Sequence, residues 1–153
     1  SSDYKSSMRW IQRTSPSAKV ISTQAMVQLL YSQFDRVTEC PLHFRNFRIL
    51  YNNGFRYLII EPQAYISYTA DKSRFSLKLF NFLDFIEKQV PPEIEFDHFN
   101  QSLMERFVFE HNENLRRSLS FLQENRNSSR SLGKLRVYDL NKMMYAIEFM
   151  SQK

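Results

Sequence analysis

Apolar side chains in this chain recur mostly at the three- and four-residue spacing of α-helices, with one short run of strand-forming residues between them. The first helical segment follows Ser22, a residue type that often caps a helix, and ends before Pro41. Its apolar positions are Met26, Leu29, Leu30, Phe34 and Val37. Because a proline disfavours helical backbone in the residue before it, the pattern predicts a helix that stops short of Pro41.

The segment that follows, residues 41–53, fits two structures. If Asn53 and Gly54 form a two-residue turn, residues 48–60 make a β-hairpin whose two faces are both apolar. If Pro41 begins a helix and Gly54 follows its end, the segment is helical instead. We prefer the hairpin, because an Asn-Gly pair between apolar runs favours such a turn. In either case FRYLII, residues 55–60, is predicted to be a strand.

Three further helices and one more strand follow from the periodicity of the remaining segments. The strand covers residues 64–69 and would complete a small antiparallel sheet. One helix covers residues 75–90, a second runs over 100–123, and a third begins after Asp139, which can cap it. Residues 93–99 lie between two of these helices and are expected to be a connection.

Together these elements predict an α+β fold in which four to five helices pack on a small antiparallel sheet or hairpin. An all-α helical domain is the alternative if residues 41–53 are helical. At 153 residues, of which 42% are hydrophobic, the chain is long enough to bury one core. We therefore expect a single globular interaction domain over residues 19–153, preceded by an N-terminal linker or arm over residues 1–18.

The amino-acid composition excludes several kinds of site. Only two glycines occur, far apart in the chain, so a loop that holds phosphate through closely spaced glycines is excluded. The single cysteine, Cys40, excludes an intrachain disulfide and a multi-cysteine zinc site, and it fits a reducing compartment. No pattern unites a nucleophile with a base and an orienting group. We therefore expect no enzyme activity, no metal and no small-molecule cofactor.

Three carboxylates alternate after a pair of prolines, at Glu93, Glu95 and Asp97. In an extended segment they would lie on one side of the chain, where such groups can hold a divalent cation. Charged residues in a connecting segment more often stay in water or pair with cations. We prefer this second interpretation.

Charge is distributed unevenly around the net value of +5. Residues 1–62 are basic, with eight Lys/Arg and four Asp/Glu. Residues 63–115 are acidic, with five Lys/Arg and nine Asp/Glu, and residues 116–153 are basic again, with eight Lys/Arg and three Asp/Glu. The acidic middle and the basic end can pair across one fold, or the basic end can bind nucleic acid or another polyanion. The candidate nucleic-acid-binding residues are Arg116, Arg117, Arg126, Arg130, Lys134 and Arg136.

The chain also carries more aromatic and methionine side chains than its own core is expected to need, which indicates a partner interface. The candidate interface residues are Leu50, Phe55, Tyr57, Met143, Met144, Tyr145 and Phe149. No apolar run approaches the about 18 residues that span a bilayer, so no membrane is expected as a partner.

The function expected from these patterns is a non-catalytic protein-interaction or assembly domain of an intracellular multi-subunit complex, in the nucleus or cytoplasm. Its partner would be another protein chain or a second copy of itself. The alternative is a nucleic-acid-binding module that uses the basic C-terminal third.

Overall fold

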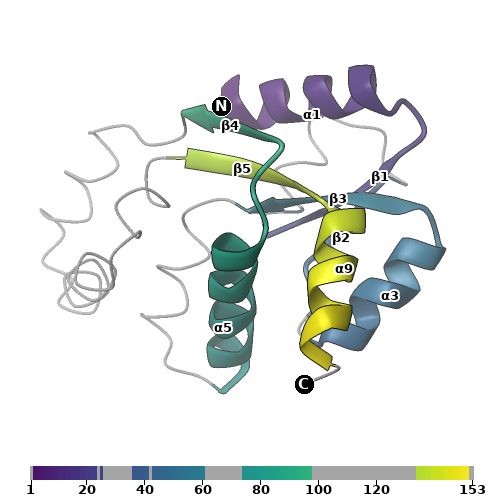
Figure 1. The fold of residues 1–153 in the computed structure, drawn as a ribbon. Coiled ribbons are helices and arrows are strands. Elements are labelled where there is room, and N and C mark those ends of the chain that lie inside the picture. The colour runs from purple at the N-terminus through teal and green to yellow at the C-terminus, as the bar shows by residue number, and fades with distance from the viewer. Residues whose placement is uncertain are drawn as a thin grey trace, which may run out of the picture.

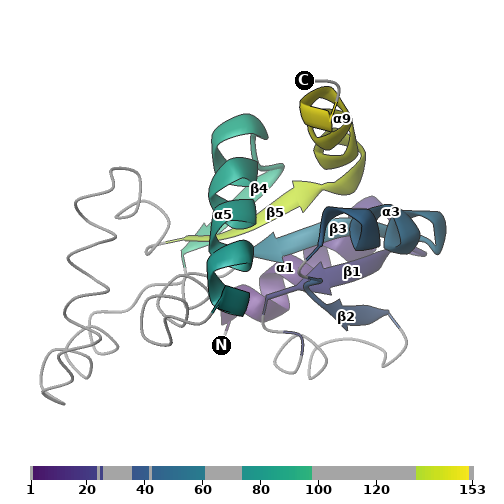
Figure 2. The same cartoon turned by 90° about the horizontal axis from the view of Figure 1, so that it is seen from below.

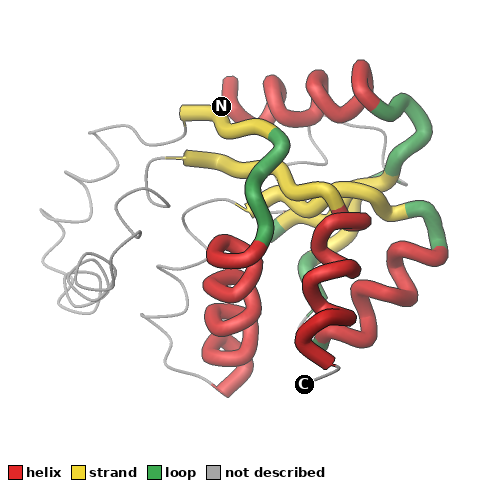
Figure 3. The backbone as a smooth tube through the Cα atoms, in the orientation of Figure 1, coloured by secondary structure: helices red, strands yellow, loops and turns green. Residues whose placement is uncertain are grey.

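A five-stranded mixed β-sheet forms the centre of the protein (Figures 1 and 3). In this computed structural model the described residues are 2–23, 25, 36–41, 43–60, 74–97 and 134–151. The strands, in the order in which they lie in the sheet, are β2 (Val37–Glu39), β1 (Lys19–Ser22), β3 (Phe55–Ile60), β5 (Lys134–Asp139) and β4 (Ile94–Asp97). β1 runs parallel to both β2 and β3, whereas β5 is antiparallel to β3 and to β4.

Helices cover both faces of this sheet (Figures 1 and 2). One face is covered by α1 (Ser2–Thr14). The other face is covered by α3 (Phe44–Asn52), α5 (Arg74–Gln89) and α9 (Leu140–Ser151). The protein therefore has three layers, with the sheet in the middle and a hydrophobic core on each side of it.

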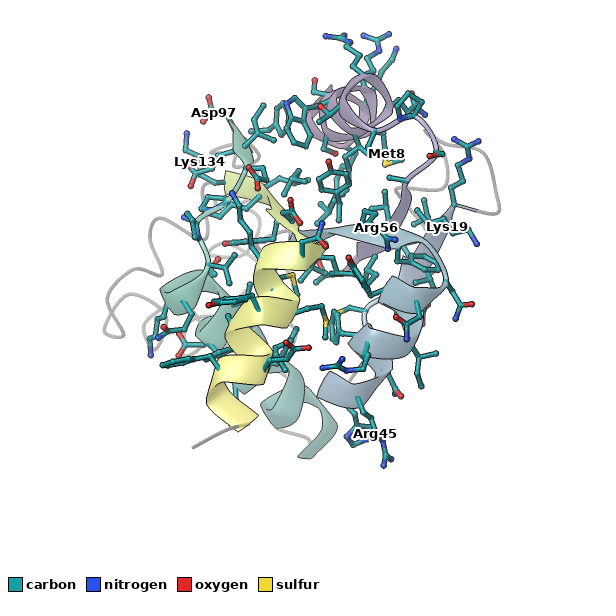
Figure 4. All side chains as sticks on the ribbon, turned by 45° about the vertical axis from the view of Figure 1, so that its right-hand side comes forward. Met8, Lys19, Arg45, Arg56, Asp97 and Lys134 are labelled. Carbon is teal, nitrogen blue, oxygen red and sulfur yellow. The ribbon has the colours of Figure 1, made fainter. Side chains whose placement is uncertain are left out.

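The core under α1 explains why residues 2–14 form a helix. Tyr4, Met8 and Ile11 follow one another at helical spacing and are buried on the side that faces the sheet. Figure 4 shows Met8 pointing from α1 towards the sheet. The sheet residues of this core are Val20, Tyr57, Ile59, Leu135 and Val137. Part of the segment expected to be a linker or arm is thus a helix packed on the sheet.

The core on the opposite face is larger and joins three helices. Its buried side chains are Ile21, Phe47, Phe55, Leu58, Ile60, Phe82, Leu83, Ile86, Val90, Tyr138, Leu140, Met143 and Met144. The rings of Phe47 in α3 and Phe82 in α5 lie 4.5 Å apart between centroids. Within β3, Leu58 and Ile60 face this core, whereas Ile59 faces the core under α1. A strand buried on both faces needs a continuous apolar run, which YLII, residues 57–60, provides.

The predicted fold class was wrong about the sheet. Helices and strands are both present, but the strands form a five-stranded mixed sheet rather than a small antiparallel sheet or hairpin. The same sheet overturns the all-α alternative. Local patterns suggested a hairpin because they report only neighbouring strands, whereas β1 and β3 are parallel strands joined through other elements.

Two local predictions need correction. The helix predicted after Ser22 was wrong at its two ends, because Ser22 is the last residue of β1 and Val37 the first of β2; its apolar positions Met26, Leu29, Leu30 and Phe34 lie outside the described residues. The predicted hairpin fails in its first half, where α3 replaces it, so the helical alternative for residues 41–53 was right in kind. A helix turns Phe47 into the core and brings Leu50 and Tyr51 partly against it, which the hairpin register would not do.

Besides β1 and β2, the strands β4 and β5 went unrecognised in the sequence. The connection predicted over residues 93–99 contains β4, and the basic residues Lys134 and Arg136 belong to β5. The predictions for residues 55–60, for residues 75–90 and for the helix after Asp139 are confirmed by β3, α5 and α9. The strand predicted over 64–69 and the helix over 100–123 lie outside the described residues.

Candidate functional site

The outer side of α9 carries two exposed aromatic side chains. The helix begins directly after β5, where the carboxylate of Asp139 accepts a hydrogen bond from the backbone N–H of Asn141 at 2.7 Å. Its inner side is fixed by Met143, which is fully buried. Tyr145 and Phe149 lie one turn apart on the other side and are 77% and 60% exposed. Their position follows from the burial of the inner side, because one helix cannot turn both sides to the core.

α3 packs beside α9 and adds a third exposed apolar side chain. Arg48 of α3 donates a hydrogen bond at 2.6 Å to Glu148 of α9, and Tyr51 donates one to Asn141. These bonds hold the two helices together at their exposed side. Ile49 of α3 is 57% exposed. We call Ile49, Tyr145 and Phe149 together the α3–α9 face, because they are the exposed large hydrophobic side chains of these two helices.

The structure separates the predicted interface residues into buried and exposed groups. Phe55, Tyr57, Met143 and Met144 are buried in the two cores, and Leu50 packs partly against the larger one. Two of the seven candidates, Tyr145 and Phe149, are large hydrophobic side chains that are exposed in the described part of the chain.

Ile49 was missed by the sequence reasoning. The hairpin interpretation placed Ile49 on an apolar strand face, whereas the helical alternative puts it on the side opposite Phe47. Choosing the helix would therefore have identified it as exposed.

The predicted nucleic-acid-binding residues that the structure describes are engaged in ion pairs. Lys134 pairs with Asp97 across neighbouring strands. Arg136 is only 6% exposed, and its guanidinium lies 2.8 Å from a carboxylate oxygen of Glu87 and 3.2 Å from one of Glu95. The remaining candidates, Arg116, Arg117, Arg126 and Arg130, lie outside the described residues.

These contacts connect the acidic middle of the chain with its basic end. Lys142 of α9 adds a further pair, 2.7 Å from Glu93. In the part of the chain that the structure describes, the interpretation in which the two segments pair across one fold is therefore confirmed. The alternating carboxylates Glu93, Glu95 and Asp97 each have a cationic partner, as the preferred interpretation predicted. The segment is not a simple connection, however, because Glu95 and Asp97 belong to β4 and Glu93 directly precedes it. Among the described residues, no group of His, Cys, Asp and Glu could hold a metal ion.

The electrostatics of this buried network favour fixed charges rather than proton transfer. Burial by itself lowers the pKa of Arg136, but Glu87, followed by Tyr138 and Glu95, raises it by more. Burial, with a smaller contribution from Glu87, raises the pKa of the Tyr138 hydroxyl. Arg136 therefore stays protonated and Tyr138 neutral over the physiological range, as a structural network requires.

A polar cavity of about 350 Å³ lies where α1 leads into β1, next to the start of α9. It is lined by Ser15, Ser17, Ala18, Gly54, Arg56, Tyr57, Asp139 and Asn141. Arg56 donates hydrogen bonds to the carbonyls of Tyr51 and Phe55, at 2.6 and 2.8 Å, and stacks on the Tyr51 ring. Asp139 caps α9. Both charged groups of the lining thus hold the fold together.

Neither Tyr57 in this cavity nor Cys40 elsewhere in the structure is an activated nucleophile. Burial, followed by the carboxylate of Asp139, raises the pKa of Tyr57, while a hydrogen bond with Ser15 lowers it by less. Burial raises the pKa of Cys40 to about 12, so its thiol is protonated at neutral pH and is a weak nucleophile. His43, three residues later, is exposed.

The described helices include none that is both long enough and apolar enough to cross a membrane. Among the surfaces that the structure describes, the α3–α9 face is the one at which apolar side chains lie open to water. Comparison of the chain with models of known protein families, with characterised proteins and with solved structures finds no match.

Proposed function

We propose that this chain is a non-catalytic protein-interaction domain of an intracellular multi-subunit complex, in the nucleus or cytoplasm, and that it docks through the α3–α9 face. The observation that carries the proposal is the exposure of Tyr145 and Phe149, one turn apart on a helix whose other side packs against the core. Tyrosine and phenylalanine are enriched at the centres of protein interfaces, where a few aromatic side chains supply most of the binding energy.

The surroundings of these aromatic side chains fit a docking surface. Arg48 and Glu148 are both about half exposed and form an ion pair across the two helices, which supplies polar groups beside the apolar ones. Interfaces of this kind combine an apolar centre with a polar rim. Because α3 and α9 both pack on the sheet, the face is already in place before a partner binds, which lowers the entropy cost of association.

The test compares a double substitution in the face with a control that adds the same charge elsewhere. Tyr145→Lys with Phe149→Lys is the test variant, and Gln12→Lys with Gln89→Lys, at two other exposed positions, is the control. A partner captured with the wild-type chain is identified by mass spectrometry, purified and titrated against all three proteins by calorimetry. We expect the double variant to bind at least about 30-fold more weakly, because two aromatic anchors are lost.

A second copy of the chain is the other arm of the same test. Sedimentation over a range of concentrations would then show a wild-type mass that rises with concentration and a monomeric double variant. Equal affinity of wild type and double variant for the partner, together with a concentration-independent monomer mass, would overturn the proposal.

A further inference from the structure

The exposed side of α1 carries a row of three cations. Lys5, Arg9 and Arg13 stand at every fourth position and are all exposed. A helix rises about 1.5 Å per residue, so successive cations are about 6 Å apart along its axis. We call these three residues the basic ridge. Figure 4 shows nitrogen-tipped side chains on the outer side of α1, pointing away from the sheet.

Unlike the cations of β5 and of the start of α9, the basic ridge has no acidic partner within the described residues. Lys134, Arg136 and Lys142 each pair with a carboxylate of the middle segment. No such pair is formed by Lys5, Arg9 or Arg13 in the same described part of the chain. Asp3 is the one acidic residue in the sequence of α1. The charge of the ridge is therefore available to an external anion.

The ridge is held rigidly and has a neighbour at one end. The opposite side of α1 is buried through Tyr4, Met8 and Ile11, so the helix cannot rotate to hide the cations. Beyond its last turn, the guanidinium of Arg36 donates a hydrogen bond to the carbonyl of Pro16. A fourth cation thus lies close to the end of α1. A fixed row of Lys and Arg side chains complements a repeating row of phosphates.

We propose that the basic ridge of α1 binds the phosphate backbone of double-stranded nucleic acid, without preference for sequence. Binding to single strands generally uses exposed aromatic rings on which bases stack. The aromatic residues of α1 are committed elsewhere, because Tyr4 is buried and the Trp10 ring packs edge-on against Tyr57 at 5.6 Å between centroids. A membrane surface would need the apolar side of the helix, which the sheet already covers.

This surface is separate from the α3–α9 face. α1 lies on one side of the sheet, and α3 and α9 lie on the other (Figures 1 and 2). A duplex on α1 and a protein on the α3–α9 face could be bound together, so the inference does not depend on the proposed function. It adds a candidate nucleic-acid contact on the first helix to the one predicted for the C-terminal third of the chain.

The experiment titrates the purified full chain against fluorescein-labelled DNA duplexes of two unrelated sequences, and against the corresponding single strands, at several salt concentrations. The test variant is Lys5→Gln, Arg9→Gln and Arg13→Gln. The matched control, Arg48→Gln, Lys88→Gln and Lys142→Gln, removes the same charge from the helices of the opposite face, where these cations have carboxylate partners. Circular dichroism confirms that all three proteins are folded.

The wild type is expected to bind both duplexes equally, with an affinity that falls steeply as salt rises. Three phosphate contacts contribute about −2.7 to the slope of log K against log salt concentration, or about a 40-fold loss for each fourfold rise in salt. The test variant should lose that part of the slope, and the control should keep it. The proposal is overturned by no duplex binding at low salt, by equal effects of the two triple variants, or by tighter binding to single strands.

An arm with anionic phosphatidylserine vesicles separates a lipid surface from a nucleic acid. Vesicle binding that depends on the ridge, without duplex binding, would also overturn the assignment. Duplex binding that depends on the ridge, with no vesicle binding, would support it.

Discussion

Arg136 is a cation in the interior of a sheet, and its surroundings explain how it can be there. It lies on β5 between β3 and β4, on the face covered by α5, and contacts Glu87 of that helix and Glu95 of β4. A buried charge costs several kcal/mol in lost hydration unless opposite charges and hydrogen bonds compensate it. Two carboxylates supply this compensation here.

Replacing Arg136 with Met should destabilise the fold strongly. The free energy of unfolding is expected to fall by about 3–5 kcal/mol, because two largely buried carboxylates lose their partner. Urea denaturation measures this difference. The control Lys134→Met removes an exposed pair on the same strand and should cost less than about 1 kcal/mol.

Adding Glu87→Gln and Glu95→Gln to Arg136→Met should restore much of the lost stability, since no uncompensated charge then remains. Equal stabilities of the Arg136 and Lys134 variants would show that the buried network contributes no more than a surface pair.

The role of Arg136 was not visible in its local sequence. It stands in a run of cations that indicated a basic surface, and its partner Glu87 is 49 residues away. The alternation in KLRVYD did carry a signal, since Leu135 and Val137 face one core and Tyr138 faces the other. Such a short alternation after a polar loop is weak evidence, because burial depends on what packs against the strand.

At the scale of elements, the junction between α3 and β3 depends on Gly54. Its backbone has φ of +95°, a conformation that is strained for residues with a side chain. Its N–H donates to the Tyr51 carbonyl at 3.1 Å, and its carbonyl accepts from the N–H of Lys19 at 3.1 Å. The glycine therefore ends the helix and joins it to the first strand.

Gly54→Ala should reduce stability by about 1–3 kcal/mol through backbone strain. Steric clash contributes little, because an added Cβ would come no closer than 3.9 Å to the Lys19 side chain. Thermal unfolding measures the loss. Gly54→Asn should cost less than Gly54→Ala, since asparagine tolerates positive φ better; equal losses would point to another cause.

The same junction shows why the sequence alone does not separate the helix from the hairpin. Residues 41–53 contain apolar side chains at both spacings, and Asn-Gly is compatible with either a hairpin turn or a helix end. The decision comes from packing. Phe47 contacts Phe82 of α5, which lies 35 positions further along the chain, and a helix is the conformation that makes this contact while leaving Arg45 and Arg48 in water.

At the scale of the whole molecule, α1 belongs to the folded unit. It supplies one of the two hydrophobic cores, and it positions the basic ridge on the side of the sheet opposite the α3–α9 face. The two proposed surfaces therefore share one scaffold, and the sheet keeps them apart.

Ile11→Ala should cost about 2–5 kcal/mol, the range for deleting a large aliphatic side chain from a packed core. Gln12→Ala, at the next and exposed position, should change stability by less than about 0.5 kcal/mol. Chemical denaturation of both variants tests the contribution of α1. Similar stabilities for both would mean that residues 2–14 behave as an arm outside the cooperative unit.

The sequence by itself determined the elements whose signals are local. α5 follows from an apolar stripe at helical spacing, α9 from the cap at Asp139, and β3 from a continuous apolar run. Each of these signals lies within the element or next to it, so distant contacts were not needed to read it.

Only the tertiary structure decided which strands pair and which charges are left open to solvent. The pairing of Val20 with Tyr57 and of Leu58 with Tyr138 joins positions far apart in the chain, and no local pattern encodes such a contact. The same pairing brings Arg136 to its carboxylates and leaves the basic ridge without an acidic partner in the described part of the chain. Charge along a sequence shows how many cations there are, whereas the fold decides which of them are neutralised, because Coulomb attraction depends on distance in space.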